Sequence, residues 1–253
     1  NKTNKNICIP LTEPVAFNQT YKHEKLDPYL LGLLLGDGCL RGERISFSTI
    51  DDKIIEELDT KVKLYDAYLT INQRTGEKCN NIAINNNKKL IKLLKSLKIY
   101  GKLAYQKFIP KLYLHLSVKE RFELVQGLMA TDGYVDNRGH MSYTTVSKQL
   151  AGDFQYLVRS LGAKATITTK TPVYEYKGNK LNGQLAYTVY FNSNHNERFV
   201  RLKRKLDRIK KWNNGNGVLH REIISIKEEG EGECVCIRVD NPNGLFITND
   251  FIV

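Results

Sequence analysis

The chain has 253 residues, 41% of them hydrophobic and 26% charged, so it can bury a core and is not a disordered chain. Lys and Arg outnumber Asp and Glu by 39 to 27, and this net charge of +12 favours a polyanionic partner, nucleic acid first and an anionic membrane second. The sequence shows no signal peptide, its five cysteines form no C-x-x-C pair and its five histidines are scattered, which argues against a disulfide scaffold, a zinc site and a histidine-based hydrolase.

A polar segment opens the chain, and a long apolar run follows it. Residues 1–26 contain two prolines and no sustained period, so we expect an irregular lead-in there. The run LLGLLLGDG covers 30–38, and the preceding Asp27–Pro28 pair is typical of a helix N-cap and first turn. The sequence therefore predicts a helix that starts at Pro28, and it predicts that Gly38 ends this helix in a left-handed conformation.

Two glycines of this run, Gly32 and Gly36, lie four residues apart and share one face of the predicted helix. A face without side chains lets a second helix backbone approach closely. The run is too short to cross a bilayer, so a membrane interpretation is rejected.

Three strands and a helix are predicted after Gly38, from alternating apolar residues and from a helical period. In the second strand the odd-numbered residues, Ile71 among them, are expected to face inward. These elements are a strand over 44–49, a helix over 52–64 capped by Asp51, and strands over 67–74 and 81–85.

A similar motif returns 95 residues later as VQGLMATDG at 125–133, where Gly127 and Thr131 keep the small-residue spacing and Asp132–Gly133 closes the segment. Gly133 is again predicted as the helix stop. The elements that follow are a strand over 140–145, a helix over 148–161 capped by Ser147, and a strand over 163–170, at an offset of 96 from the first set. The chain is therefore predicted to contain an internal repeat.

The acids that close the two motifs, Asp37 and Asp132, are placed unfavourably for anions. A helix C-terminus disfavours a negative charge, and two parallel, adjacent helices would also bring the carboxylates together. An Asp-Gly turn after a buried leucine-rich helix is ordinary in a single copy, but the duplicated pattern favours a bound cation. Oxygen ligands of this type suit Mg²⁺, which keeps several waters and uses one or two carboxylates.

LLGLLLGDG and VQGLMATDG resemble the two motifs of LAGLIDADG homing endonucleases in their single-chain, two-repeat form, although Leu35 replaces the first Asp and Val125–Gln126 replaces Leu-Ala. The resemblance implies an α+β fold in which two pseudo-symmetric αββαββα repeats form a DNA-binding saddle, with a small C-terminal β segment. It makes Asp37 and Asp132 catalytic metal ligands. The expected divisions are a lead-in at 1–26, repeats at 27–115 and 116–212, and a tail at 213–253.

Each repeat ends in a basic stretch, 88–111 and 198–211, each with eight Lys or Arg residues, and we expect both to flank DNA phosphates. In QKFIP, Lys107 matches the K-x-I-P block of intein-type members, and the resemblance makes it catalytic. The second stretch lacks that block, so Lys210 is predicted as its catalytic lysine, with Lys211 and Lys203 as further candidates.

One face of each predicted sheet is polar, and a two-stranded ribbon fits the major groove of B-DNA. A solvated face is the simpler interpretation for any single residue, but it explains the complete set less well. Hairpins at 73–81 and 173–184 are expected to extend the sheets. The predicted DNA contacts are Arg41, Arg44, Ser46, Ser48, Tyr68, Thr70, Asn72, Arg74, Lys78, Arg138, His140, Ser142, Thr144, Lys164, Thr166, Thr168, Lys170, Tyr174, Tyr176 and Lys180.

The tail changes character, since residues 222–253 carry seven acids and two bases. Strands are predicted over 223–227, 234–239 and 245–253. ECVCIRVDNPNGLFITNDFIV resembles the end of an intein splicing domain, but His-Asn does not follow Val253, and the N-terminal nucleophile is absent from residues 1–26. We therefore expect that the chain alone does not splice protein, and that it is an endonuclease lodged in an intein, with the other half of a split intein as a candidate partner. A plain β appendage is the alternative.

Together with these features, the resemblance implies a monomeric, pseudo-twofold DNA endonuclease that cuts both strands and leaves short 3′ overhangs. Because the two repeats differ in sequence, its target is expected to be long and asymmetric. Mg²⁺ is the expected cofactor, Mn²⁺ is expected to substitute for it, and Ca²⁺ is expected to support binding without cleavage. The alternatives are a non-catalytic nucleic-acid binder, either an RNA maturase or a transcription regulator, and the endonuclease part of a split protein-splicing element. The expected location is the cytoplasm of a bacterial, phage or archaeal host, or otherwise wherever the DNA of the host gene resides, and secretion is not expected.

Overall fold

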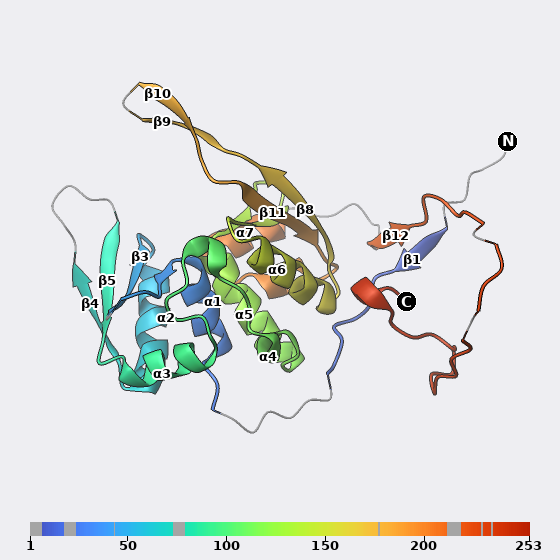
Figure 1. The fold of residues 1–253 in the computed structure, drawn as a ribbon, viewed down its shortest axis with the longest axis horizontal. Helices are drawn as coiled ribbons and strands as arrows, with labels where there is room; N and C mark the ends of the chain where they lie inside the picture. Colours follow the sequence, from blue (N-terminus) through green and yellow to red (C-terminus); the bar gives the residue numbers. More distant parts are fainter. Residues whose placement is uncertain are drawn as a thin grey trace.

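Two four-stranded antiparallel sheets and the helices around them form the body of the molecule (Figure 1). The computed structural model describes residues 7–17, 24–42, 44–72, 79–176, 178–211, 219–228, 230–233 and 235–253. Helices and antiparallel sheets are mixed along the chain, which confirms the predicted α+β class. No helix in these described ranges is long and apolar enough to cross a membrane.

The first repeat has the strand order β2-β3-β5-β4. Its first helix is capped as predicted, since Asp27 accepts a hydrogen bond from the Leu30 N–H at 2.9 Å. Ile71 is exposed, contrary to the prediction, because β4 is the edge strand of the sheet. The elements are α1 (Pro28–Gly36), β2 (Gly38–Cys39), β3 (Ile45–Thr49), α2 (Asp52–Val62), β4 (Tyr68–Asn72), β5 (Asn80–Asn85) and α3 (Lys88–Ser96).

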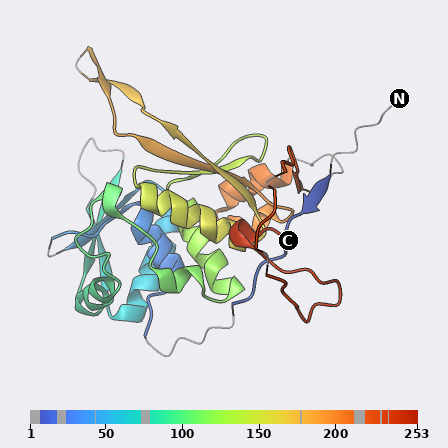
Figure 2. The same cartoon turned by 45° about the vertical axis from the view of Figure 1, so that its right-hand side comes forward.

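The second repeat has the matching order β6-β7-β11-β8, and β9 pairs with β10 as a separate hairpin. Ser117 and Glu120 form a capping box at the start of its motif helix. Figures 1 and 2 show the β9–β10 hairpin projecting well beyond the sheet. The elements are α4 (Lys111–Leu114), α5 (Val118–Ala130), β6 (Gly133–Val135), β7 (Met141–Thr145), α6 (Lys148–Ser160), β8 (Lys164–Lys170), β9 (Val173–Tyr176), β10 (Asn179–Asn182), β11 (Ala186–Asn192) and α7 (Lys203–Lys211).

Helices α1 and α5 pack against each other at the centre of the molecule through their bare faces. A Cβ atom on Gly32 would lie 2.5 Å from the Leu124 carbonyl oxygen, and one on Gly127 would lie 2.3 Å from the Tyr29 carbonyl oxygen. Further along, a Cβ on Gly36 would meet the side chain of Thr131 at 1.9 Å. Contacts therefore advance in the same direction on both helices, so the pair is parallel and its two C-terminal ends lie together.

This close approach gives a prediction for stability. Gly127→Ala is expected to lower the free energy of unfolding by about 2–3 kcal/mol, because its Cβ would overlap the backbone of α1 and the helices would have to separate. Gly152→Ala is the matched control, since Gly152 lies on α6 with no atom within 4 Å of an added Cβ, and there alanine is expected to stabilise the helix by up to about 1 kcal/mol. Chemical denaturation measures both, and an equal effect of the two substitutions would contradict the packing.

The predicted role of Gly38 and Gly133 as left-handed helix stops is wrong. Neither residue has a positive φ, and they begin strands β2 and β6. Glycine is needed for a different reason, since a Cβ at Gly38 would lie 2.5 Å from the Leu34 carbonyl oxygen and one at Gly133 would lie 2.5 Å from the Met129 Cα. At both positions the backbone turns back so tightly over the preceding helix that a side chain has no room.

The lead-in is more ordered than predicted. Strand β1 (Cys8–Pro10) pairs with β12 (His220–Glu222), so segments from the two ends of the sequence share a small sheet. The Val15 N–H donates to the Ser160 carbonyl at 2.9 Å, and the buried Arg121 side chain donates to the Val15 carbonyl. The described part of the lead-in is therefore fixed against the second repeat.

The three strands predicted in the tail are wrong for the residues that the structure describes there, which form no ladder beyond β12. Apolar side chains remain in water, with Ile224 94% exposed and Val235 89% exposed. A strand requires partner strands and a covered face, and within the described residues this segment has neither. One short turn at Asn249–Phe251 does contact the body, where the ring of Phe251 lies edge-on to Tyr156 of α6.

Candidate metal and nucleic-acid site

Asp37 and Asp132 lie at the adjacent C-terminal ends of α1 and α5. Asp37 is the C-cap of α1, and its N–H donates to the Leu33 carbonyl at 3.1 Å. Both side chains remain exposed to solvent. The packed helix ends still partly desolvate each carboxylate. This partial desolvation, together with the negative charge of Asp37, raises the pKa of Asp132 to about 6, and partial desolvation also raises the pKa of Asp37. The two carboxylates therefore repel each other, as a divalent cation site without its ion would require.

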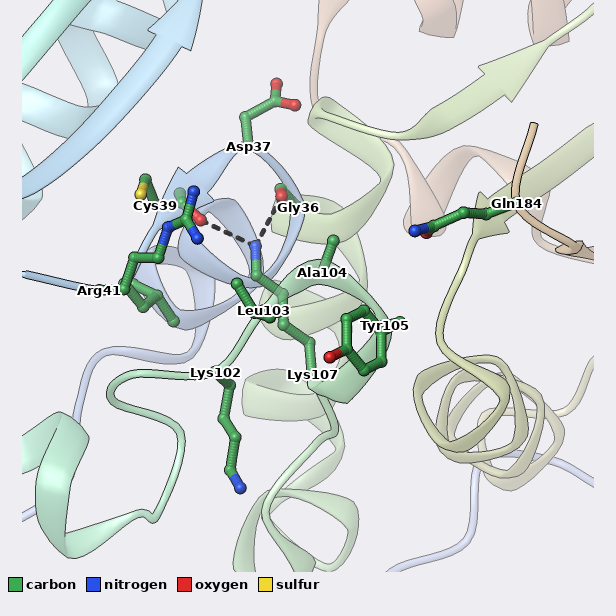
Figure 3. A pocket seen from close by; sticks show the side chains of 12 residues that line it. Gly36, Asp37, Cys39, Arg41, Lys102, Leu103, Ala104, Tyr105, Lys107 and Gln184 are labelled. Atoms are coloured by element: carbon green, nitrogen blue, oxygen red, sulfur yellow. Dashed lines mark hydrogen bonds between the residues drawn. The ribbon is translucent and has the colours of Figure 1, made fainter. Parts of the chain in front are cut away.

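Lys107 lies buried beneath the end of α1. Its Nζ donates to three backbone carbonyls, those of Leu34 at 3.2 Å, Gly36 at 2.9 Å and Gly38 at 2.8 Å, and Figure 3 shows the last two bonds. Burial lowers the pKa of Lys107 to about 8, and the charges of Asp132 and Asp37 oppose this shift. Three acceptors match the three N–H bonds of an ammonium group, so the geometry fits the protonated lysine.

Lys205 has the same arrangement in the second repeat. Its buried Nζ donates to the carbonyls of Met129 at 2.6 Å, Ala130 at 3.1 Å and Gly133 at 2.6 Å. Burial also lowers its pKa to about 8. Lys205 is therefore the equivalent of Lys107 in the second repeat.

Sequence reasoning missed Lys205 and named Lys210 instead. The side chains of Lys210 and Lys211 lie outside the described residues, while Lys203 is 85% exposed and pairs with Asp207 on its own helix. A usable signal was present, because Lys205 follows Leu202 and precedes Leu206 and Ile209 at helical spacing. It is thus a lysine on the apolar face of α7, where a charged residue needs a specific partner.

A cavity of about 480 Å³ opens beside Asp37, between the end of α1 and the second repeat's Gln184 (Figure 3). Arg41, Lys102 and Lys107 line it together with Asp37, so three cationic residues and one acidic residue share its wall. Carboxylate, carbonyl and cationic groups gathered in one place suit a phosphate oxygen bridged by a metal ion, and Asp37 and Asp132 are the residues that could hold the ion.

Most of the predicted DNA contacts in the first repeat lie on one exposed sheet face. In the register, Ser46 and Thr70 both lie opposite Ala83, and Ser48 and Asn72 lie opposite Asn81. Tyr68, Arg41 and Arg44 are also exposed. Arg74 and Lys78, together with most of the predicted 73–81 hairpin, lie outside the described residues.

The second sheet presents a similar polar row. Thr188 lies between Thr144 and Thr168, and its hydroxyl is 3.0 Å from that of Thr144. The predicted residues Arg138, His140, Lys164, Thr166 and Lys170, and Tyr174, Tyr176 and Lys180 of the hairpin, are all exposed.

Ser142 is an exception to this row, because it is buried. It lies opposite Tyr134 on one side and Tyr190 on the other, and these rings are 58% and 51% exposed. Both tyrosines therefore belong to the face that Ser142 was expected to supply. Tyr190 was missed because strand β11 was missed, although Val189 and Phe191 alternate with Thr188 and Tyr190.

The two basic stretches do not serve only as phosphate-facing flanks, contrary to the prediction. Lys107 turns inward, as described above. In the second stretch Arg201 pairs with Glu57 at 2.9 Å and Arg204 pairs with Asp51 at 2.8 Å, so these guanidinium groups connect the two repeats.

Residues 119–228 match the family model described as a LAGLIDADG-like domain. This match includes the second of the two motifs, and it supports the resemblance that the motifs predicted. Among curated proteins, the homothallic switching endonuclease of Saccharomyces cerevisiae is 28% identical over 186 residues, which cover 63% of this chain and 31% of that protein. The replicative DNA helicase DnaB of Mycobacterium intracellulare is 26% identical over 230 residues, with coverages of 89% and 34%. The chain spans about a third of the length of these two relatives.

Two solved structures are similar to this chain at low sequence identity. I-DmoI in complex with DNA and Ca has a TM-score of 0.49 and 12% identity, and the match covers 74% of this chain and 97% of that one. The N-terminal LAGLIDADG domain of DUF199/WhiA has a TM-score of 0.43 and 13% identity, with coverages of 76% and 86%.

Proposed function

We propose that this protein is a site-specific DNA endonuclease that makes a metal-dependent double-strand break in a long, asymmetric target. The observation that carries the proposal is the paired arrangement at the ends of α1 and α5. Each helix ends in a solvent-accessible aspartate, and beneath each end a buried lysine binds three carbonyls. Two such half-sites side by side suit two phosphodiester bonds, one on each strand.

Divalent ions held by Asp37 and Asp132 would supply an activated water and stabilise the charge on the phosphate. The residues of the chain contribute the rest. The carboxylates hold negative charge close together, and at neutral pH a bound cation would relieve their repulsion. Lys107 and Lys205 hold positive charge next to them, and they neutralise the helix-end carbonyls that would otherwise repel a phosphate.

DNA recognition is assigned to the two polar sheet faces and to the β9–β10 hairpin. Hydroxyl, amide and basic side chains on a ribbon can bind base edges in the major groove. The first sheet offers Ser48 and Asn72 where the second offers Thr144 and Thr168, so the two half-sites are expected to differ in sequence. Because the net charge is +12, binding should weaken steeply as salt is raised.

Selection of cleaved sites from a randomised DNA library in Mg²⁺ tests this function and defines the target. We expect one long, asymmetric consensus, and sequencing of the ends is expected to show short 3′ overhangs. Selective binding of a DNA or RNA without metal-dependent cleavage would contradict the proposal, and it would favour the non-catalytic binder on the same fold.

The raised pKa of Asp132 gives a prediction for pH. Protons compete with metal for a carboxylate, so cleavage at a fixed, limiting Mg²⁺ concentration should fall as pH drops through about 6. Because the lysines have pKa values of about 8, loss of their protons should also lower the rate above that pH, which gives a bell-shaped profile. Initial rates between pH 5 and 9 measure this. Raising Mg²⁺ should move only the acidic limb, and a rate independent of pH between 5 and 7 would contradict the assignment.

The tail favours a second candidate role, as the endonuclease part of a protein-splicing element that a partner chain completes. Strands β1 and β12 bring the described lead-in and tail together, and apolar residues of the tail such as Ile226 and Ile237 are exposed. An added chain that supplies strands would cover these residues. Mixing the protein with a candidate partner fragment should yield a ligated product, and absence of both binding and ligation would count against this role.

A further inference from the structure

The segments that carry the two buried lysines are each held by a helix of the opposite repeat. For Lys107, the Ser147 hydroxyl donates to the Lys107 carbonyl at 2.6 Å, and the Ile109 N–H donates to Asp153 Oδ2 at 2.9 Å. Ser147 is the N-cap of α6, and Asp153 lies within that helix. Both side chains are buried, so the backbone around Lys107 is fixed at two points by the second repeat.

For Lys205, the holding helix is α2 of the first repeat. Arg204 Nε donates to Asp51 Oδ2 at 2.8 Å, and Arg201 Nε lies 2.9 Å from Glu57 Oε1. Burial alone would raise the pKa of Asp51, but the hydrogen bond and charge of Arg204, together with the backbone N–H groups at the start of α2, outweigh it and hold that pKa below its ordinary value. The carboxylate therefore stays ionised and keeps its partner.

The two sets of contacts use equivalent positions of the repeat. Asp51 and Ser147 are 96 residues apart, and so are Glu57 and Asp153, which is the offset that aligns the strands of the two repeats. Both N-cap residues also accept a bond from their own helix, Ser147 from the Leu150 N–H at 3.1 Å and Asp51 from the Lys53 N–H at 3.0 Å. Equivalent positions thus hold equivalent segments through different chemistry, hydrogen bonds to the backbone on one side and ion pairs with arginine side chains on the other.

We propose that Ser147 and Asp153 are positioning residues for Lys107, and that Asp51 and Glu57 are positioning residues for Lys205. Each half-site then needs both repeats, because one supplies the aspartate and the other fixes the lysine beside it. This inference rests on the proposed endonuclease function. A lysine side chain is long, and misplacing a catalytic group by about 1 Å can slow a reaction by about 10²-fold, so loss of one pair of contacts should slow the cutting of one strand.

Substitutions of Ser147 and Asp51 can remove the bond to the lysine-bearing segment of the opposite repeat and still keep the helix cap. Ser147→Asp retains a capping oxygen but, when ionised, has no proton for the Lys107 carbonyl, while Ser147→Thr retains both functions. Asp51→Ser exchanges the cap of α2 for the one that the second repeat uses, and leaves Arg204 without its carboxylate. Gln155→Ala is the control on α6, since Gln155 binds the Ala165 carbonyl and not a lysine-bearing segment.

The experiment follows each labelled strand of the selected duplex separately under single-turnover conditions, with unfolding temperature measured in parallel. Ser147→Asp is expected to slow one strand by about 10-fold or more and leave nicked DNA, and Asp51→Ser is expected to slow the opposite strand. Ser147→Thr and Gln155→Ala should cut both strands as the unchanged protein does. The alkaline limb for the slowed strand should also move, because a displaced lysine leaves its carbonyls.

Equal slowing of both strands by each variant, or no slowing at all, would overturn the inference while the endonuclease assignment stands. General loss of stability would affect both strands alike, so strand bias separates positioning from folding. If the unchanged protein cut neither strand, the proposed function itself would fall, and the inference with it.

Discussion

Asp37→Asn and Asp132→Asn are each expected to lower double-strand cleavage by about 10³-fold or more, equivalent to about 4 kcal/mol of transition-state stabilisation. Asparagine keeps the size of the side chain and removes the charge that would bind a divalent ion. DNA binding should persist, because the polar sheet faces lie on other elements. Cleavage of the selected duplex in Mg²⁺ and its binding in Ca²⁺ measure the two properties separately.

Asp132→Asn should raise the stability of the metal-free protein although it lowers cleavage. The pKa of Asp132 is raised in the folded state, so its ionised form is disfavoured there, and this penalty acts at pH values above its unfolded pKa. At pH 7, Asp132→Asn should therefore raise the unfolding temperature of the metal-free protein by about 2–4 °C, if solvent screening reduces the penalty to about 1 kcal/mol. Normal cutting of both strands by either variant would contradict the metal site, whatever its stability.

Lys107→Met and Lys205→Met are expected to slow cleavage by about 10²-fold each, and each on a different strand. Methionine fills much of the space of the buried lysine stem, so the loss should come from the missing ammonium group and not from a cavity. Because each lysine binds the carbonyls beneath one helix end, its absence should affect the phosphate next to that end more than the other.

Lys203→Met is the matched control for this pair. Lys203 lies on α7 with Lys205, but its side chain is exposed and pairs with Asp207. In this control variant, the cleavage rate of each strand should equal that of the unchanged protein. Loss of activity in Lys203→Met with normal rates in Lys205→Met would reject the assignment of the second lysine.

The central features of the site could be predicted because they depend on local spacing. The four-residue spacing of Gly32 and Gly36 by itself places both glycines on one helix face, which then lacks side chains. Asp37 follows at the helix C-terminus, where an anion is disfavoured. The duplication of this pattern then predicted the partner helix and the second acid. The caps at Asp27, Asp51 and Ser147 were also confirmed, because capping is a local property.

The errors arose where tertiary contacts decide. Gly38 was correctly seen as special, but the reason is the distance from its missing Cβ to the Leu34 carbonyl, which no local rule provides. Lys205 was missed because the search followed a sequence block and not the apolar face of α7. The tail was assigned strands from its residue types, yet residues such as Val235 have no partner strand in the part of the chain that the structure describes.

The most direct measurement is the anomalous diffraction of Mn²⁺ in crystals of the protein with its selected duplex. We expect manganese peaks beside the carboxylates of Asp37 and Asp132, with a scissile phosphate against each half-site and the duplex lying along the two polar sheet faces. Manganese bound elsewhere, or a duplex on another face of the molecule, would contradict it.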